Sequence, residues 1–131
     1  MRRSDVMRRI KSRDTGPELI VRTLLRRMGH TGYRLDRRDL PGRPDIAFIG
    51  RRKAIFVHGC FWHGHDCPRG ARVPRTNTDY WIAKISRNTA RDRAALSTLS
   101  ETNWTSLVIW ECQLKDTAEL ETRLAEFLAS P

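Results

Sequence analysis

Residues 57–67 constrain the fold of this chain most, because five histidine and cysteine side chains, which can bind a metal ion, are concentrated there. They are three histidines and two cysteines, namely His58, Cys60, His63, His65 and Cys67. The stretch from residue 59 to residue 78 shows neither helical nor strand periodicity and contains glycine and proline, which predicts a long loop. Loops of this length are usually functional or disordered, and a bound metal could order this one.

The thiols favour a zinc site over a disulfide framework. The chain has three cysteines, an odd number, and its charged N-terminus does not open into an apolar export signal. A closed structural zinc site takes four nitrogen or sulfur ligands. Cys60, Cys67 and one histidine supply three, and Cys112 is the third thiol of the sequence. The spacing leaves open whether His63 or His65 joins them, and whether Cys112 is instead a buried core thiol.

The remaining segments predict a single domain over residues 1–131, with a basic N-terminal arm at 1–14. Apolar residues at helical spacing predict helices at 15–28, at 78–102 in one piece or two, and at 117–129. The predicted buried side of the second helix is marked by Trp81, Ile82, Ile85, Leu96 and Leu99. Strands are predicted at 33–35, 45–49, 53–58 and 104–110, the middle two forming a hairpin. This order predicts an α/β fold with one mixed central sheet flanked by helices, as in restriction-endonuclease-like nuclease cores and in many other α/β domains.

The charge of the chain indicates its class of partner. A formal net charge of +10 attracts polyanions, and nucleic acid is the commonest partner of a basic domain of this size. No run of about 18 apolar residues occurs, so no transmembrane helix is predicted. With the charged N-terminus, this predicts a soluble cytoplasmic protein without a membrane partner.

A carboxylate at the head of a predicted strand is the first candidate for catalysis. Asp45 follows Pro44 there and could hold Mg²⁺ against a phosphate, although Pro-Asp is also ordinary turn chemistry. Nuclease sites of this type usually carry an acidic residue, one spacer and a lysine on the next strand. Phe56, Val57 and His58 stand in that place. Any active site would therefore use histidine where relatives of that core use glutamate and lysine.

Two further carboxylates each allow two interpretations. Glu18 would complete a helix capping box with Thr15, or it could reach water around a nearby metal ion. Asp92 is by default a solvated helix residue, but it could instead orient a catalytic histidine.

Large aromatic residues lie between the candidate metal ligands. Phe61 and Trp62 could pack beneath the loop, or they could insert between base steps and bend DNA. Tyr80 and Trp81, at the start of the next predicted helix, could form a second aromatic element.

Taken together, these segments resemble the very short patch repair (Vsr) endonuclease family. The matching stretches follow the family order and are 13–15 with Glu18, 40–45, 56–67, Trp81 with Lys84, Ile85 and Asn88, 91–93 and 110–112. The run from His58 to His63 is the most specific of them. The sequence departs from the family at Val57, where some members have threonine, and in its short arm before Met7.

The resemblance implies a nuclease that nicks one strand of duplex DNA next to a thymine mispaired with guanine. Such mismatches arise when 5-methylcytosine deaminates, and the nick would start very short patch repair in the bacterial cytoplasm. The resemblance also implies a restriction-endonuclease-like core with a zinc-stabilised loop. A monomeric enzyme is expected, with mismatch-repair proteins as candidate partners.

The resemblance implies a role for each matching position. The implied catalytic residues are Asp45, His63, His58, Glu18 and Asp92. Asp45 and the backbone carbonyl of Val57 would hold Mg²⁺, and His63 would be the general acid/base with Asp92 behind it. His58 and Glu18 would act through the phosphate and the waters around the metal. The implied zinc ligands are Cys60, His65, Cys67 and Cys112. The implied intercalating residues are Phe61, Trp62 and Trp81.

Two rival functions remain at this point. A zinc-stabilised DNA-binding module without catalysis would explain the charge and the Cys/His cluster, but it would leave Asp45, His58 and His63 without a role. A nuclease of the same core that acts on other DNA would use all of these residues.

Overall fold

The computed structural model describes residues 16–68 and 74–130, so the predicted basic arm at 1–14 and Thr15 lie outside the described residues. The elements follow one another as α2 (Gly16–Arg27), β1 (Arg34–Leu35), β2 (Ile46–Phe48), β3 (Lys53–His58), α3 (Thr78–Glu101), β4 (Thr105–Trp110), the 3₁₀ helix η1 (Glu111–Lys115) and α4 (Thr117–Ala129). The predicted order of helices and strands is confirmed. Only η1 was not expected. None of the helices in these two ranges combines the length and the apolar composition that a membrane span requires.

The four strands form one mixed sheet in the order β1-β2-β3-β4. β1 and β2 are antiparallel, and β2 and β3 form the predicted antiparallel hairpin, with Ile46 opposite Ile55. β3 and β4 are parallel and are joined through α3, as a parallel crossover requires. His58, the last residue of β3, lies opposite Trp110, the last residue of β4.

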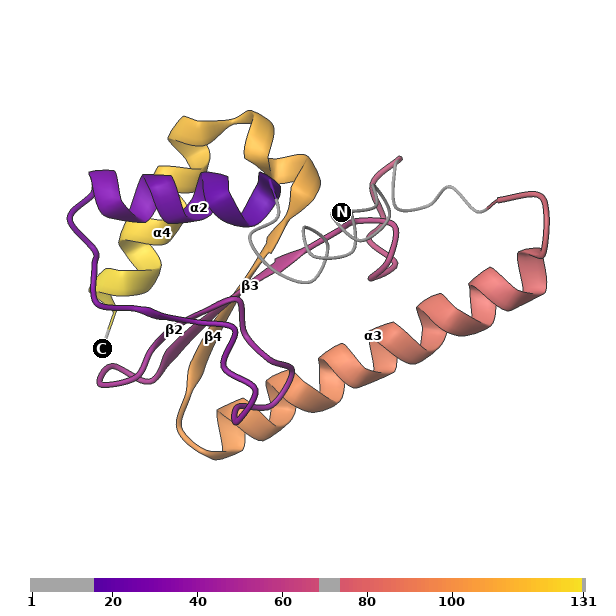
Figure 1. The fold of residues 1–131 in the computed structure, drawn as a ribbon, viewed down its shortest axis with the longest axis horizontal. Coiled ribbons are helices and arrows are strands. Elements are labelled where there is room, and N and C mark those ends of the chain that lie inside the picture. Colours follow the sequence, from indigo (N-terminus) through magenta and orange to yellow (C-terminus); the bar gives the residue numbers. More distant parts are fainter. Residues whose placement is uncertain (1–15, 69–73, 131) are drawn as a thin grey trace, which may run out of the picture.

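Helices cover both faces of the sheet, with α2 and α4 on one side and α3 on the other (Figure 1). Successive residues of a strand point to opposite faces, and the core follows this alternation. Ile55 of β3 packs with the buried leucines of α2 and α4. Its neighbours Ala54 and Phe56 pack instead with Leu99 of α3. His58 has the same parity as Phe56 and is therefore directed towards α3.

Helix α3 is one continuous helix of 24 residues, which settles the alternative of two pieces. Its N-terminal half extends beyond the sheet (Figure 1). The prediction that Ile82 lies on the buried side is wrong, because this residue is 53% exposed on the extending half. Leu99, near the other end, is fully buried against the sheet. The extending half leaves α3 side chains available to hold the loop that follows β3.

Candidate active site and metal centre

A cavity of about 510 Å³ lies where β3 ends, and it collects residues that are far apart in the sequence. Its walls come from α2, the turn before β2, the end of β3, the following loop, α3 and η1. All five residues predicted to be catalytic line it, namely Glu18, Asp45, His58, His63 and Asp92. The structure therefore brings the predicted carboxylates and histidines into one site.

One side of the site is formed by three carboxylates. Oxygens of Glu18, Asp36 and Asp45 lie within 4.8 Å of one another. Asp45 Oδ2 accepts a hydrogen bond of 2.7 Å from the backbone N–H of Val57, and the carboxylate of Glu18, only 2% exposed, pairs with Arg22 at 3.4 Å. Carboxylate oxygens are the ligands that Mg²⁺ prefers, so this donor set fits a divalent cation.

The raised pKa of Asp45 also favours a cation at this cluster. Burial raises the pKa of Asp45 to about 7, against the opposing hydrogen bond from Val57, and the negative charges of Glu18 and Asp36 add to the rise. A cation among these groups would offset the repulsion and favour the ionised form.

Asp36 was not predicted as a site residue. It follows β1, and its backbone N–H donates to the carbonyl oxygen of Asp45 at 3.2 Å. This contact continues the pairing of β1 with β2, so a register that the sequence did not specify brings the third carboxylate into place.

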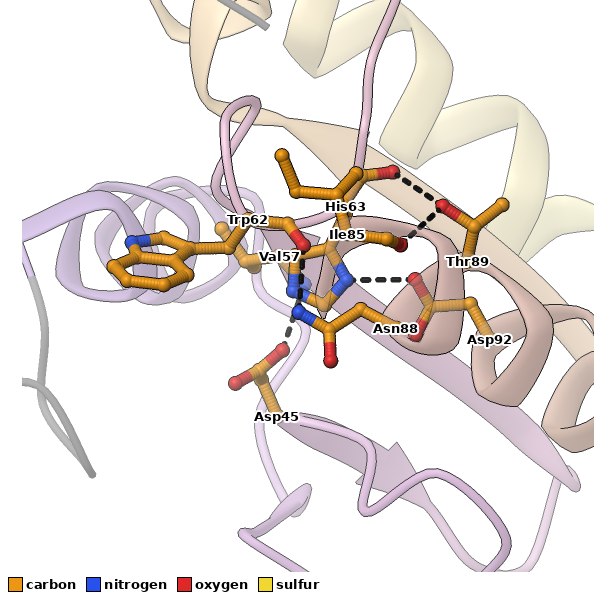
Figure 2. Close-up of polar contacts among 8 residues, drawn as sticks. All are labelled: Asp45, Val57, Trp62, His63, Ile85, Asn88, Thr89 and Asp92. Atoms are coloured by element: carbon orange, nitrogen blue, oxygen red, sulfur yellow. Dashed lines mark hydrogen bonds and ion pairs between the residues drawn. The ribbon is translucent and has the colours of Figure 1, made fainter. Parts of the chain in front are cut away.

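The other side of the site contains two stacked histidines. The rings of His58 and His63 are parallel within 3°, with centroids 3.9 Å apart. His63 Nδ1 lies 2.6 Å from Asp92 Oδ2 (Figure 2). An ionised carboxylate only accepts hydrogen bonds, so the proton of the neutral ring is on Nδ1 and Nε2 is able to accept a proton. Burial lowers the pKa of His58 to about 4, with the charge of His63 adding and Asp92 opposing, so His58 is neutral near pH 7.

Helix α3 holds the loop that carries His63 through three polar side chains on one face. Asn88 Nδ2 donates to the carbonyl oxygen of Trp62 at 2.8 Å, and Thr89 Oγ1 donates to that of His63 at 3.5 Å (Figure 2). With Asp92, they sit at positions i, i+1 and i+4 of the helix. The loop can approach this closely because Gly64 has φ +64° and a Cβ there would lie 2.9 Å from Ile85 Cγ2. Asn88 was identified only as a position that matches the family, and Thr89 was not predicted, so their contacts with the loop are new.

The predicted zinc ligands form a second cluster, which does not line this cavity. Ligand atoms of Cys60, His65, Cys67 and Cys112 lie within 4.8 Å of one another. Cys112 Sγ is 3.5 Å from His65 Nδ1, and the backbone N–H of Cys112 donates to Cys60 Sγ at 3.4 Å. The structure thus selects His65 over His63 for this cluster. It also places the half-buried Cys112 in η1 rather than in the core.

Three sulfurs and one imidazole nitrogen suit a closed tetrahedral zinc site. Burial raises the pKa of the Cys60 thiol to about 11, so a bound cation would have to stabilise its thiolate. The ring of His65 stacks on Trp110 at 4.2 Å, which fixes its orientation towards the thiols.

The aromatic residues of the loop pack with those of α3. The ring centroids of Phe61, Trp62 and Trp81 lie 5.2–5.6 Å apart, and Tyr80 adds a fourth ring 5.1 Å from Trp81. Trp62 is 43% exposed and Tyr80 is 53% exposed, so the cluster is not a closed core. Trp62 also lines the cavity, so exposed aromatic surface borders the candidate active site.

Comparisons with known proteins identify the family of this chain. Residues 1–69 match the family model of the DNA mismatch endonuclease Vsr. The chain is 43% identical to the DNA mismatch endonuclease Vsr of Escherichia coli, over 90% of this chain and 74% of that protein. It is 46% identical to the type II nicking enzyme V.XorIIP of Xanthomonas oryzae, over 97% of this chain and 92% of that protein. It is 40% identical to the type II nicking enzyme V.NmeAIP of Neisseria meningitidis, over 94% of this chain and 86% of that protein. The chain therefore belongs to the DNA mismatch endonuclease Vsr family.

Proposed function

We propose that this chain is a Mg²⁺-dependent endonuclease that nicks one strand of duplex DNA next to the thymine of a T:G mismatch and so starts very short patch repair. Family membership identifies it as a DNA endonuclease. The observation that carries the finer proposal is the single cavity that joins a carboxylate cluster to a histidine–aspartate pair. The mixed sheet, with Asp45 leading into the β2–β3 hairpin, supports assignment to a restriction-endonuclease-like core.

Asp45 is the proposed principal ligand of the catalytic Mg²⁺, because it is the carboxylate fixed by the end of β3. The backbone carbonyl of Val57 is proposed as a further ligand, since Val57 lines the same cavity and its N–H is bonded to Asp45. A carbonyl ligand does not depend on the side chain, so valine in place of threonine should be tolerated. When bound, the cation would polarise the phosphate and offset its charge.

His63 is the proposed general acid/base of the hydrolysis. A water oxygen adds to phosphorus, one P–O ester bond breaks, and the leaving oxygen ends with a proton. Asp92 holds His63 in the tautomer whose Nε2 can exchange that proton. His58, neutral and 7% exposed, is suited to donate an N–H to the phosphate. Glu18, fixed by Arg22, is proposed to order water around the cation.

The Cys/His cluster is proposed to hold a structural zinc. The purified protein should contain about one zinc per chain, and Cys112→Ser should lose it, with a decrease of about 3 kcal/mol or more in the free energy of unfolding. Metal analysis by mass spectrometry and thermal unfolding provide the measurements. Lys115→Ser, a substitution at an exposed position of the same 3₁₀ helix, is the matched control. It should change neither the zinc content nor the free energy of unfolding. A wild-type protein without zinc, or a Cys112→Ser variant that retains it, would contradict the assignment.

The aromatic cluster is proposed to insert between base steps beside the mismatch. Unstacking a base step costs roughly a few kcal/mol and costs least at a mispair. Inserted aromatic side chains, acting as a wedge, would therefore favour binding to a mismatched duplex over a matched one. Trp62→Ala should reduce the ratio of T:G to matched-duplex affinity by about tenfold and leave affinity for matched DNA nearly unchanged. Tyr33→Ala, which removes an aromatic contact with Phe48 far along the sheet, controls for general loss of stability. Equal losses on both duplexes would reject the wedge.

Nicking of a labelled T:G duplex tests the function directly. We expect one cut in the thymine strand with Mg²⁺, none with excess chelator, and none on the matched duplex. Tight binding without a cut would favour the DNA-binding module, and equal cutting of matched DNA would favour a nuclease for other DNA. Varying the bases around the mismatch in the same assay would identify the preferred flanks.

A monomeric enzyme is expected. Contacts with mismatch-repair proteins remain a prediction from family resemblance, as does the extent of the nuclease domain over residues 1–131.

A further inference from the structure

We propose that Arg43 binds a non-bridging oxygen of the scissile phosphate and stabilises the negative charge on it during hydrolysis. This inference rests on the proposed function of the same cavity. Arg43 lines that cavity together with Asp45, His58 and His63, yet neither the motif pattern nor the carboxylate and histidine clusters assign it a role.

The charges that line the cavity favour a cation of this kind. Four carboxylates line it, from Glu18, Asp45, Asp92 and Glu111. Among the described lining residues, Arg43 is the single arginine or lysine. A phosphodiester entering the site brings a further negative charge. A cationic side chain beside the metal site would help to offset this additional charge.

The guanidinium of Arg43 is available for a substrate. Neighbouring arginines are already engaged, Arg22 with Glu18 at 3.4 Å and Arg37 with Asp39 at 2.7 Å. Arg43 is exposed, and within residues 16–68 and 74–130 no carboxylate pairs with its side chain. An arginine presents N–H groups in a planar fork that matches two phosphate oxygens, so it suits this task better than a lysine.

The backbone holds Arg43 in place beside the catalytic carboxylate. Its N–H donates to the carbonyl oxygen of Leu40 at 3.1 Å, which closes a turn. Gly42 packs directly against the neighbouring elements, since a Cβ there would lie 2.7 Å from Ala95 Cβ of α3. Pro44, on the other side, is fully buried. The turn is thus anchored at both flanks, and the exposed Arg43 lies between them in the wall of the cavity.

The conformation of Arg43 is itself costly. Its φ of +52° lies in the left-handed region, which costs a residue with a side chain on the order of 1 kcal/mol. Arg52 has φ +55° in a similar turn, with its N–H bonded to Ile49 at 3.2 Å, and it is also exposed. Arg52 precedes β3, whereas the cavity lies where β3 ends, so it provides a matched control for Arg43.

The test measures single-turnover nicking of a T:G duplex by excess enzyme, with DNA affinity measured separately by fluorescence anisotropy in Ca²⁺. Arg43→Ala should slow nicking about a hundredfold, as loss of one transition-state donor does, and should weaken DNA binding by less than about tenfold. Arg43→Lys keeps the charge and should slow nicking by roughly tenfold. Arg52→Ala should match the wild type in both measurements.

Sulfur substitution and chemical rescue connect the effect to the phosphate. A phosphorothioate at the scissile position should slow the wild type more than Arg43→Ala, because the variant has already lost the contact. Added guanidinium at low millimolar concentration should partly restore Arg43→Ala and should not affect Arg52→Ala.

Three outcomes would overturn the inference. One is Arg43→Ala nicking at the wild-type rate, another is equal losses in the two arginine variants, and the third is a loss confined to DNA affinity. Should Arg43→Ala fail to fold, a wild-type rate in Arg43→Lys with an unchanged sulfur effect would reject it as well. A wild-type protein that nicks no mismatched duplex would instead reject the proposed function, and Arg43 with it.

Discussion

Asp45→Asn should reduce the rate of T:G nicking by at least about a thousandfold, because a cation that polarises the phosphate contributes several kcal/mol to the transition state. Asparagine keeps the shape of the side chain and an oxygen that can accept the Val57 N–H. It removes the negative charge that makes the carboxylate a strong ligand. The measurement is single-turnover nicking over a range of Mg²⁺ concentrations, with cation binding followed by calorimetry.

The pKa of Asp45 gives this prediction a pH dependence. With its pKa raised to about 7, the metal-free carboxyl is mostly protonated below that pH and mostly ionised above it. Mg²⁺ must then compete with a proton, so nicking at subsaturating Mg²⁺ should increase as the pH rises from about 6 to 8. At saturating Mg²⁺ this dependence should weaken, because the cation displaces the proton.

Asp39→Asn is the matched control for Asp45→Asn. Asp39 precedes the same turn, but it is exposed and its carboxylate pairs with Arg37. Removing its charge should alter neither nicking nor cation binding by more than about twofold, since exposed ion pairs contribute little. Undiminished nicking by Asp45→Asn would refute the assignment of the catalytic ligand. If Asp45→Asn lost nicking but bound the cation as well as the wild type, other residues would be the ligands of the cation.

Strand and helix periodicity were sufficient to predict how the core is layered. Alternation along β3 places Ile55 and Phe56 on opposite faces, so the sequence places His58 on the face of Phe56. The packing of Phe56 with Leu99 then identifies that face as the α3 side. The predicted buried side of the helix 78–102 was wrong at Ile82. Periodicity identifies an apolar face without indicating how far the sheet extends beneath it.

The loop after β3 could not be predicted in the same way, because its geometry depends on distant contacts. Spacing alone could not distinguish His63 from His65. Asn88 and Asp92 of α3 engage Trp62 and His63, while the thiol of Cys112 engages His65. These partners lie more than twenty residues away in sequence. Asp36 escaped prediction for the same reason, since strand register brings it to Asp45.

Three sets of contacts therefore divide the residues of this loop. One set directs His63 and its neighbour His58 to the cavity, a second directs Cys60, His65 and Cys67 to the thiol of Cys112, and a third joins Phe61 and Trp62 to Trp81. Hydrogen bonds from α3 hold the loop on one side, and the Cys/His cluster holds it on the other. Metal binding in the cluster and proton transfer in the cavity should then be separable by substitution at adjacent histidines.

His63→Ala and His65→Ala provide that separation within three residues of the same loop. His63→Ala should slow nicking by about a thousandfold, within the range expected for loss of a general acid/base, while retaining the zinc and the unfolding temperature of the wild type. His65→Ala should lose zinc and stability, and any loss of nicking should follow the fraction of protein that remains folded. Asp92→Asn should resemble His63→Ala, because the amide no longer holds the imidazole in the tautomer that exposes Nε2.

Added imidazole distinguishes a chemical role of His63 from a packing role. The cavity left by His63→Ala borders the ring of His58, which was 3.9 Å from the missing imidazole, so a small imidazole can bind there. Nicking by His63→Ala should therefore increase with imidazole concentration and with the fraction of imidazole that is neutral, whereas Asp92→Asn should not respond. Zinc loss from His63→Ala, or rescue of both variants alike, would show that His63 supports the loop instead of moving the proton.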